Sequence, residues 1–474
     1  MIKVEKRKIY WFFIYPVAAL TFAVISVLFI MSARGYNMHF EKNGIVFVKT
    51  GMLIVSSKPT GAKIVLDGKD TSKKTNFFSV KINNLSKKKH VLTLEKEGYF
   101  KWEKEINIVP EMVTWANYVL MFSKNPKIDK VDFSGSLVQS VPSLDNRQNL
   151  VLTRTKDSEV LYSVQNSTGG KNVILDTVKI AEDKRMSGIS VLDWSKDKRN
   201  VLITGSLKSD QRFWVVNMDS KSVDDVSTIT PLKFSRIMFS TANNDELYGS
   251  LNGELMRVNI RTKSVSNVLE SHISYFSFSE NGKIYYIKDD KGVRSLFQAN
   301  GDLGGKVDLS DAIPVSEAYT LKVDLKDQKA LLKTKENNAL YLLTKVGDKN
   351  SLITIGKNIS DFAWAKDSIR FFYKIRGANV VVFESDDYKK ESVEYNIAGS
   401  EKFQNILWYD PRHLLFQSGD KAMIMDFDGT NRVVLGDSLD SLRIFFTADN
   451  GDIYFFSPSV KQEQALLSRY RVEF

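Results

Sequence analysis

One apolar run dominates the pattern of hydrophobic and polar positions along the chain. Residues 9–33 contain no charged side chain, whereas four of the first eight residues are Lys or Arg. A helix of this length, at about 1.5 Å per residue, exceeds the thickness of a hydrocarbon core of about 30 Å. The pattern therefore predicts a short tail over 1–8 and a single transmembrane helix over 9–33, with Pro16 in its first turns.

The flanking charges predict how this helix is oriented. The basic cluster before residue 9 outweighs Arg34 on the other side, and positively charged flanks stay in the cytoplasm. We therefore expect a cytoplasmic N-terminus and extracytoplasmic domains at the cell membrane. A cleaved signal peptide is the alternative. Its apolar region is normally only about 7 to 15 residues long, and Met31 and Ala33 fit its cleavage site poorly, so we favour an uncleaved anchor.

Beyond the helix, apolar and polar residues alternate with a period of two, which is typical of strands that bury one face. Residues 34–50 are predicted to form a linker hairpin around Asn43 and Gly44. Leu53 and Val55 alternate along the predicted strand, and Asp67 with Gly68 is typical of a hairpin turn. The pattern predicts a small antiparallel β-sandwich over 51–123.

The segment of the predicted sandwich contains a characteristic set of turn glycines, alternating apolar residues and aromatic residues. The positions are Gly51, Leu53, Val55, Ser56, Pro59, Gly61, Ala62, Leu66, Asp67, Gly68, Thr75, Leu85, His90, Leu94, Lys96, Gly98, Tyr99 and Trp102. With these residues the segment resembles a PEGA domain, a small β-module of prokaryotic envelope and surface proteins. It departs at Thr60, where the eponymous motif has Glu, and at Asn76, where Pro is usual. The resemblance implies an envelope module without an established catalytic group.

A repeated pattern of strand, polar turn and strand fills the remainder of the chain. Each copy has a bulky or apolar anchor residue at the end of its first strand. The eight anchors are spaced by about 43 residues on average, which is the length of a four-stranded propeller blade. They are Pro142, Trp194, Phe239, Phe278, Leu325, Trp364, Trp408 and Phe446.

These copies resemble the WD40-like repeats of TolB-type bacterial envelope propellers, in which an aromatic-Ser-Pro-Asp-Gly turn marks each blade, although most copies here lack the Pro. The predicted fold class is thus all-β: a transmembrane helix, a PEGA-like β-sandwich and a β-propeller over 127–474. Eight blades are favoured and seven are the alternative. The last copy has room for three strands, so we expect residues 127–133 to supply the fourth and close the ring.

The distribution of charge argues against a nucleic-acid binder. The chain has a formal net charge of +11, yet the excess lies before residue 128 and the predicted propeller is close to neutral. Lys73 and Lys74, and then Lys87, Lys88 and Lys89, concentrate positive charge in the predicted sandwich near the membrane. Such clusters attract anionic lipid, acidic wall polymer or polysaccharide. A solvated lysine-rich loop is the alternative.

Motifs for catalysis, cofactors and metals are weak. The chain has no Cys, and its four His residues lack the spacing of a metal site. Residues 301–306 and 426–431 are superficially similar to a phosphate loop and a calcium loop, and we expect both to be turns. We predict no catalytic residue, no cofactor and no metal ligand.

Together these features predict a membrane-anchored, non-enzymatic surface protein. It would bind or scaffold envelope components, including an unknown protein partner, through the propeller face, with the basic module near the membrane or wall. The alternative is an envelope enzyme, a glycosidase or a lyase, with its active site in the propeller funnel.

Overall fold

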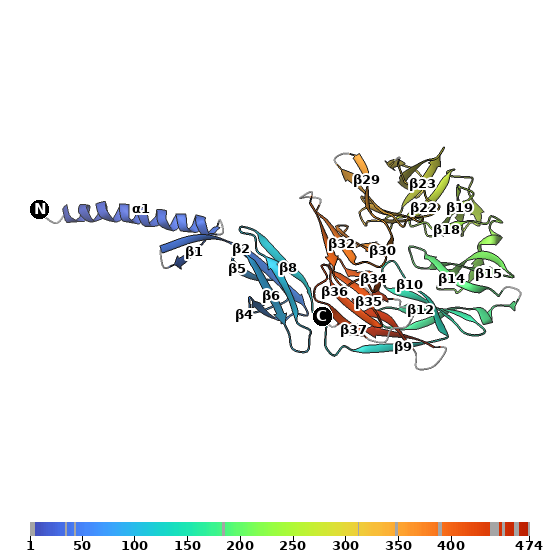
Figure 1. Cartoon of the computed structure of the whole chain (residues 1–474), viewed down its shortest axis with the longest axis horizontal. Helices are drawn as coiled ribbons and strands as arrows, with labels where there is room; N and C mark the ends of the chain where they lie inside the picture. Colours follow the sequence, from blue (N-terminus) through green and yellow to red (C-terminus); the bar gives the residue numbers. More distant parts are fainter. Residues whose placement is uncertain are drawn as a thin grey trace. The chain divides into compact units, whose positions relative to one another are not determined.

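The chain folds as one helix followed by β-structure, as its pattern predicts (Figure 1). The computed structural model describes residues 5–33, 36–41, 44–182, 185–310, 312–346, 349–386, 391–436, 445–447, 451–458 and 464–472. Two units are distinct: Met1–Pro126 with Glu473–Phe474, and Lys127–Val472. Each is described separately below.

Helix α1 (Glu5–Ala33) begins four residues before the apolar run, so it includes the basic residues that precede it. Its window Ile14–Met31 has a mean hydropathy of 2.3 and no buried residues, which makes α1 long and apolar enough to cross a membrane by length and composition. Pro16 is an interior residue of this helix, so its expected place in the first turns is wrong. The helix starts earlier because residues 5–8 are good helix formers that extend it by one turn.

A hairpin joins α1 to the sandwich. Strand β1 (Tyr36–Glu41) pairs antiparallel with the first part of β2 (Gly44–Lys58), from Tyr36 opposite Lys49 to Glu41 opposite Gly44. Asn43 of the expected turn lies outside the described residues. Strand β2 continues without a break into the sandwich, so the expected boundary between linker and sandwich falls inside one strand.

Two sheets form the sandwich: β1-β2-β5 with β8 also paired to β2, and β4-β3-β6-β7. Their buried core includes Leu53, Ile64, Leu94 and Trp102. The β2–β8 pair is parallel, so the expectation of a purely antiparallel sandwich is wrong for this pair. No hairpin fixes the direction of β8, because the chain changes sheets between β7 and β8. The strands are β3 (Lys63–Leu66), β4 (Lys69–Lys74), β5 (Val80–Ser86), β6 (Lys89–Glu95), β7 (Trp102–Asn107) and β8 (Val113–Leu120).

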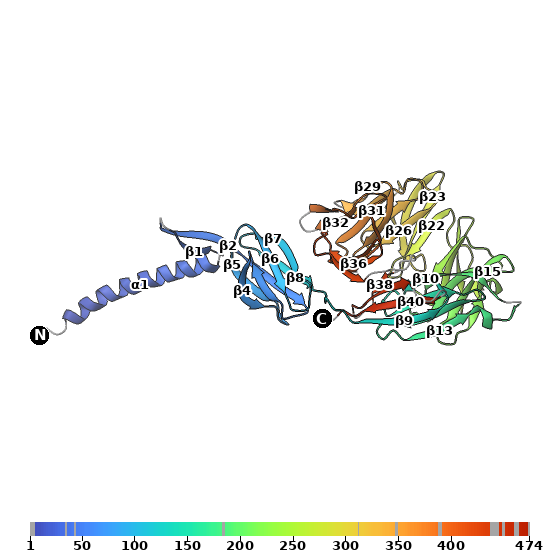
Figure 2. The same ribbon diagram turned by 60° about the horizontal axis from the view of Figure 1, so that its bottom comes forward.

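The second unit is a succession of four-stranded antiparallel sheets arranged around the unit in chain order (Figures 1 and 2). Eight such sheets lie within its described residues, and seven of them use four consecutive strands. In those seven, the strands are β10 (Ser136–Pro142), β11 (Gln148–Arg154), β12 (Glu159–Gln165) and β13 (Lys171–Asp176); β14 (Ser187–Trp194), β15 (Asn200–Leu207), β16 (Asp210–Asn217) and β17 (Val223–Asp225); β18 (Arg236–Phe239), β19 (Glu246–Leu251), β20 (Glu254–Asn259) and β21 (Ser264–Val265); β22 (Ile273–Phe278), β23 (Lys283–Asp290), β24 (Val293–Asn300) and β25 (Val307–Ser310); β26 (Tyr319–Val323), β27 (Ala330–Thr334), β28 (Leu340–Val346) and β29 (Lys349–Gly356); β30 (Ile359–Trp364), β31 (Arg370–Ile375), β32 (Val380–Asp386) and β33 (Glu391–Ile397); and β34 (Phe403–Asp410), β35 (His413–Ser418), β36 (Lys421–Asp426) and β37 (Val433–Gly436).

The remaining sheet joins the two ends of the unit. Strands β38 (Phe445–Thr447), β39 (Ile453–Pro458) and β40 (Gln464–Tyr470) are completed by β9 (Ile128–Ser134), which pairs with β40 from Ile128 opposite Tyr470 to Ser134 opposite Gln464. The prediction that the segment before the first copy supplies the missing strand is confirmed. Phe133 and Phe456 of this sheet pack with Tyr162 of the first sheet.

The repeated turns share one hydrogen-bond pattern. Ser195 Oγ donates to Asp197 at 2.7 Å and accepts the Asn200 N–H, and Ser143 repeats both contacts with Asp145 and Gln148. Three of the predicted anchors are tryptophans that hold neighbouring sheets together. Their indole N–H groups donate to backbone carbonyls of the preceding sheet: Trp194 to Val141, Trp364 to Lys322 and Trp408 to Ala363. Part of the last copy, residues 448–450, lies outside the described residues.

Candidate functional site

The 87–89 turn, made of Lys87, Lys88 and Lys89, lies at the end of the sandwich where β2 enters. Ser86 at the end of β5 is opposite Thr50 of β2. The hairpin register places Lys49 opposite Tyr36, only three residues after the end of α1. The fold therefore brings this lysine turn next to the chain segment that leaves the apolar helix, although some 50 residues separate them in sequence.

Acidic residues partly neutralise this turn. The Asp67 carboxylate lies 3.1 Å from Lys88 Nζ and 2.9 Å from His90 Nδ1, and it accepts the Val91 N–H. Burial opposes ionisation of Asp67, but the Val91 N–H, Lys88 and His90 outweigh it and lower its pKa to about 2. Lys89 Nζ lies 2.6 Å from Glu105. Lys87 is exposed, and it adds positive charge beside Lys88 and Lys89, which are already paired with carboxylates.

Lys73 and Lys74 lie at the other end of the sandwich strands, so the five predicted lysines do not form one site. Lys74 is opposite Lys63, which is in turn opposite Glu95 at the end of β6, whereas Lys89 begins that strand. Lys73 Nζ donates to the Lys81 carbonyl at 2.6 Å. Sequence reasoning grouped the lysines by composition, but the strand directions separate them.

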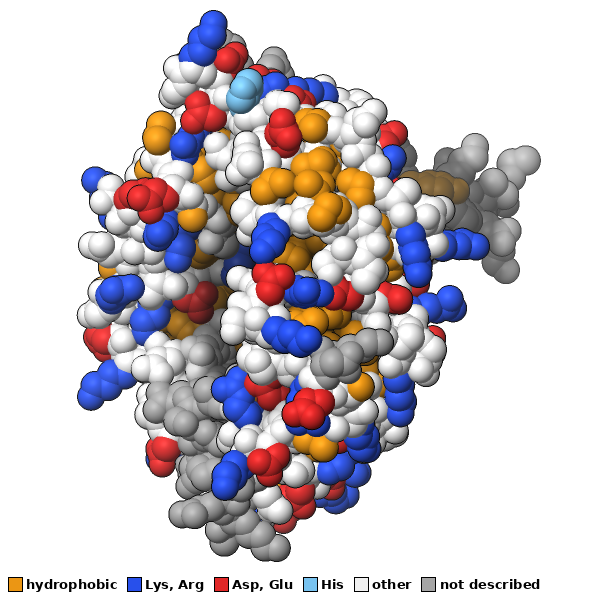
Figure 3. Space-filling model, turned by 90° about the vertical axis from the view of Figure 1, so that its right-hand side faces the viewer, with side chains coloured by type: hydrophobic (Ala, Val, Ile, Leu, Met, Phe, Trp, Pro, Cys, Tyr) orange, Lys and Arg blue, Asp and Glu red, His pale blue; other side chains and the backbone are white. Residues whose placement is uncertain are grey.

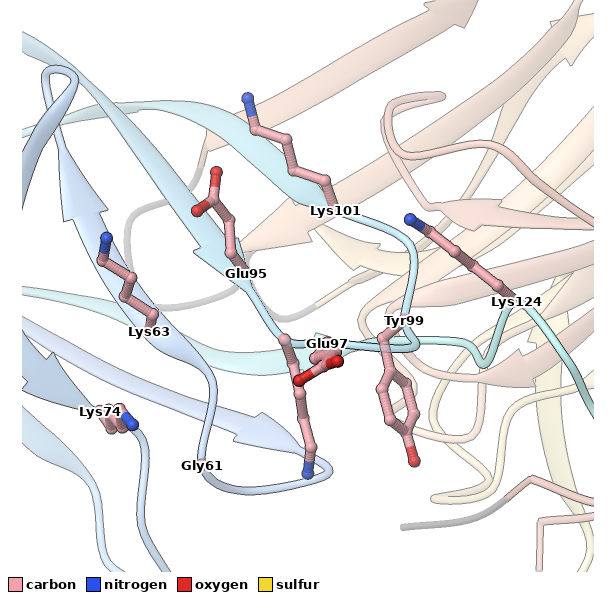
Figure 4. A pocket seen from close by; sticks show the side chains of 9 residues that line it. Gly61, Lys63, Lys74, Glu95, Glu97, Tyr99, Lys101 and Lys124 are labelled. Atoms are coloured by element: carbon pink, nitrogen blue, oxygen red, sulfur yellow. The ribbon is translucent and has the colours of Figure 1, made fainter.

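A basic groove that the sequence did not indicate lies at this second end (Figure 4). It has a volume of about 640 Å³. Lys96 crosses it, donating to the Thr60 carbonyl at 2.6 Å with its ammonium 5.2 Å from the Tyr99 ring centre. Lys74 belongs to the predicted Lys73–Lys74 pair, but the other lysines of the groove are single positions spread over some 60 residues, so no local signal reveals the groove. The lining residues are Gly61, Lys63, Lys74, Glu95, Lys96, Glu97, Tyr99, Lys101 and Lys124.

In the propeller, a cavity of about 790 Å³ lies between the second and third sheets. Its walls combine apolar side chains such as Phe213 and Phe234 with the charged residues Asp193, Arg212 and Arg236. Over one face of this unit, Lys and Arg are interspersed with Asp and Glu (Figure 3). This distribution agrees with the near-neutral charge of the segment.

The charged residues of this cavity differ in their partners. Asp193 accepts the Trp194 and Phe239 N–H groups, both at 2.9 Å, and its burial raises its pKa to about 6 despite these bonds. Arg212 pairs with Asp225 at 2.9 Å. Arg236 stacks 4.6 Å from the Tyr275 ring centre and has no carboxylate within ion-pair distance among the described residues. Arg236 is therefore the cation best placed to meet an anionic group.

The two segments that are superficially similar to a phosphate loop and a calcium loop are turns. Residues 301–306 connect β24 to β25, with the Asn300 N–H bonded to the Gly304 carbonyl. Residues 426–431 connect β36 to β37, and Asp426 lies beside the buried His413, which also contacts Asp410 at 2.9 Å. Burial lowers the pKa of His413, but the two carboxylates outweigh it and raise it to about 9. Within the described ranges no three His, Cys, Asp or Glu side chains are grouped to hold a metal ion.

The architecture defines an all-β protein with an apolar N-terminal helix, a small sandwich and a propeller-like unit. Residues 50–124 match the model of the PEGA domain, so the sandwich is a PEGA domain, as its residues predicted. Trp102, one of the residues on which the resemblance to a PEGA domain rests, is buried in the core of the sandwich. No curated protein sequence is similar to the chain.

Solved structures with similar folds include propellers. The C-terminal WD40 domain of Sif2 is 11% identical with a TM-score of 0.46, covering 73% of this chain and 99% of that one. An oligogalacturonate lyase from Vibrio parahaemolyticus is 11% identical with a TM-score of 0.40, over 71% and 98% of the two chains. TolB from Acinetobacter baumannii is 14% identical with a TM-score of 0.33, over 56% and 60%. The order of the sheets along the chain, with β9 completing the last one, defines the propeller-like unit.

Proposed function

We propose that the chain is a single-pass membrane protein whose PEGA domain meets anionic lipid headgroups through the 87–89 turn. The propeller is then an extracytoplasmic binding domain. One observation carries the proposal: the pairs Tyr36–Lys49 and Thr50–Ser86 bring this turn to the end of α1. A Lys close to an anionic leaflet contributes about 1 kcal/mol of attraction. Lys87 supplies this attraction in full, whereas Asp67 and Glu105 partly neutralise Lys88 and Lys89.

The propeller cavity supports binding in preference to catalysis. A glycosidase needs two carboxyl groups that reach the substrate. Here both Asp193 oxygens accept backbone N–H groups, and Asp210 pairs with Lys233 at 2.8 Å. Arg236, which forms no ion pair within 4 Å among the described residues, suits an anionic group on an envelope component, while Phe213 and Phe234 suit its apolar part. This domain is accordingly proposed to bind or scaffold, without enzymatic activity.

Lysine footprinting tests the contact with lipid. The full chain is reconstituted in vesicles with or without anionic lipid and treated with a water-soluble amine-reactive ester. We expect anionic lipid to slow the modification of Lys87 severalfold, because the headgroups cover the turn and hold its ammonium group. High salt should restore the neutral-vesicle rate, because exposed charges are screened.

Lys221 is the matched control, because it is an exposed lysine in the turn before β17 of the propeller. Its modification rate should be the same in both vesicles. Equal protection of Lys87 and Lys221, or no protection of either, would contradict the proposed contact.

A further inference from the structure

Two adjacent phenylalanines of the PEGA domain are exposed almost completely. Phe77 and Phe78 lie between β4 and β5 with 91% and 76% of their side chains exposed. Their rings pack edge to face, with centres 5.7 Å apart. Burying either ring elsewhere in the domain would stabilise the fold, so their exposure points to a role outside it.

The outer face of the neighbouring sheet carries an exposed tryptophan. Leu53 and Val55 of β2 point into the core, so Ile54 between them lies on the outer face, where neighbouring side chains leave it only 6% exposed. Ile54 is opposite Trp115 of β8 on one side and Lys81 of β5 on the other. Trp115 is 55% exposed. Directly opposite residues lie about 5 Å apart, so Lys81, Ile54 and Trp115 form one continuous row.

The exposed phenylalanines lie in the loop that leads into the edge strand of this sheet. Strand β5 begins at Val80, two residues after Phe78, and Val80 is opposite Val55. Lys73 reaches the same edge, since its Nζ donates to the Lys81 carbonyl. Exposed aromatic rings and lysines therefore lie on this sheet and in the loop at its β5 edge, and we call them the aromatic face: Lys73, Phe77, Phe78, Lys81 and Trp115.

We infer that the aromatic face inserts its rings into the headgroup region of the bilayer that α1 spans. This inference rests on the proposed function. Because the 87–89 turn and Lys73 lie at opposite ends of the strands, it adds that the PEGA domain lies with its long side along the bilayer. Trp and Phe beside Lys form the combination that binds an anionic membrane interface, with the rings at the acyl boundary and the ammonium groups among headgroups.

The short link to α1 explains why a small exposed face is enough to hold the PEGA domain against the bilayer. Tyr36, opposite Lys49, is only three residues from the end of α1, so the domain stays at high local concentration beside the bilayer. A contact too weak to recruit a free protein is then occupied for most of the time. The lysines of the aromatic face complement an anionic leaflet, and this complementarity favours lipid over an apolar protein partner.

Depth-dependent quenching tests the inference on the full chain in lipid nanodiscs. The chain has no Cys, so a single fluorophore can be attached at Phe78→Cys or, as control, at Glu103→Cys on the exposed side of β7 in the opposite sheet. With nitroxide-labelled anionic lipids, we expect strong quenching at position 78 and little at position 103. Lys73→Glu with Lys81→Glu should remove most of the quenching at 78.

Failure of this inference is distinct from failure of the proposed function. If the chain does not enter nanodiscs at all, the anchor itself is wrong. If it enters, and position 78 is quenched no more than position 103, the aromatic face does not meet lipid. Crosslinking of position 78 to a second copy or another protein, without quenching, would overturn the inference in favour of a protein contact.

Discussion

Replacing Arg469 by methionine is expected to lower the free energy of unfolding of the propeller by about 3–5 kcal/mol, since it removes the cation that neutralises a buried carboxylate. Arg469 donates from Nε and from a terminal nitrogen to Asp452, at 2.7 and 2.5 Å, and both side chains are more than nine-tenths buried. The same guanidinium donates to the Ser167 carbonyl of the first sheet at 2.6 Å. This residue thus links the two ends of the unit.

Denaturant unfolding of the full chain in detergent, followed by tryptophan fluorescence, measures this loss. Arg471→Met is the matched control, because Arg471 pairs with Asp129 at 2.6 Å but both side chains are almost half exposed. Exposed pairs of this kind contribute less than about 1 kcal/mol. If Arg469→Met costs no more than Arg471→Met, the buried pair does not hold the closing sheet in place.

The second large effect is expected in the apolar helix. Leu20→Arg combined with Val24→Arg places two charges one turn apart in the centre of α1, at a cost of about 2.5–3.5 kcal/mol each for insertion. We expect the double variant to leave the carbonate-resistant membrane fraction, because the helix no longer partitions stably into lipid. Sedimentation of carbonate-washed membranes measures this partition.

Leu20→Ile with Val24→Ile is the control, since it keeps the apolar character at the same positions. This variant should stay in the membrane fraction. If the arginine variant is also retained, α1 is not what holds the chain at the membrane.

Local patterns predicted most of the fold because they are fixed by neighbours in sequence. The serine-aspartate turns at Ser143 and Ser195 repeat one hydrogen-bond network, which is why the repeats are visible in the sequence. The closing strand β9 was predictable because the last copy lacked one strand. The parallel β2–β8 pair was not predictable, because alternation marks a strand but not its direction.

The candidate sites were less accessible to sequence reasoning. Lysine runs located the 87–89 turn but not its position at the end of α1, which depends on two strand registers. Phe77 and Phe78 look like core residues in sequence, and only the fold exposes them. Arg236 and Asp193 are 43 positions apart and meet in one cavity only through the packing of two sheets.

The central claim is that α1 spans the membrane once, with the PEGA domain and the propeller outside the cytoplasm. Because the chain has no Cys, Lys3→Cys and Asp219→Cys each give a single thiol, the second one exposed in the propeller. A membrane-impermeant maleimide is applied to intact cells, and again after the membrane is opened. We predict that position 219 reacts in intact cells and position 3 reacts only after opening. Labelling of position 3 but not position 219 in intact cells would contradict this account.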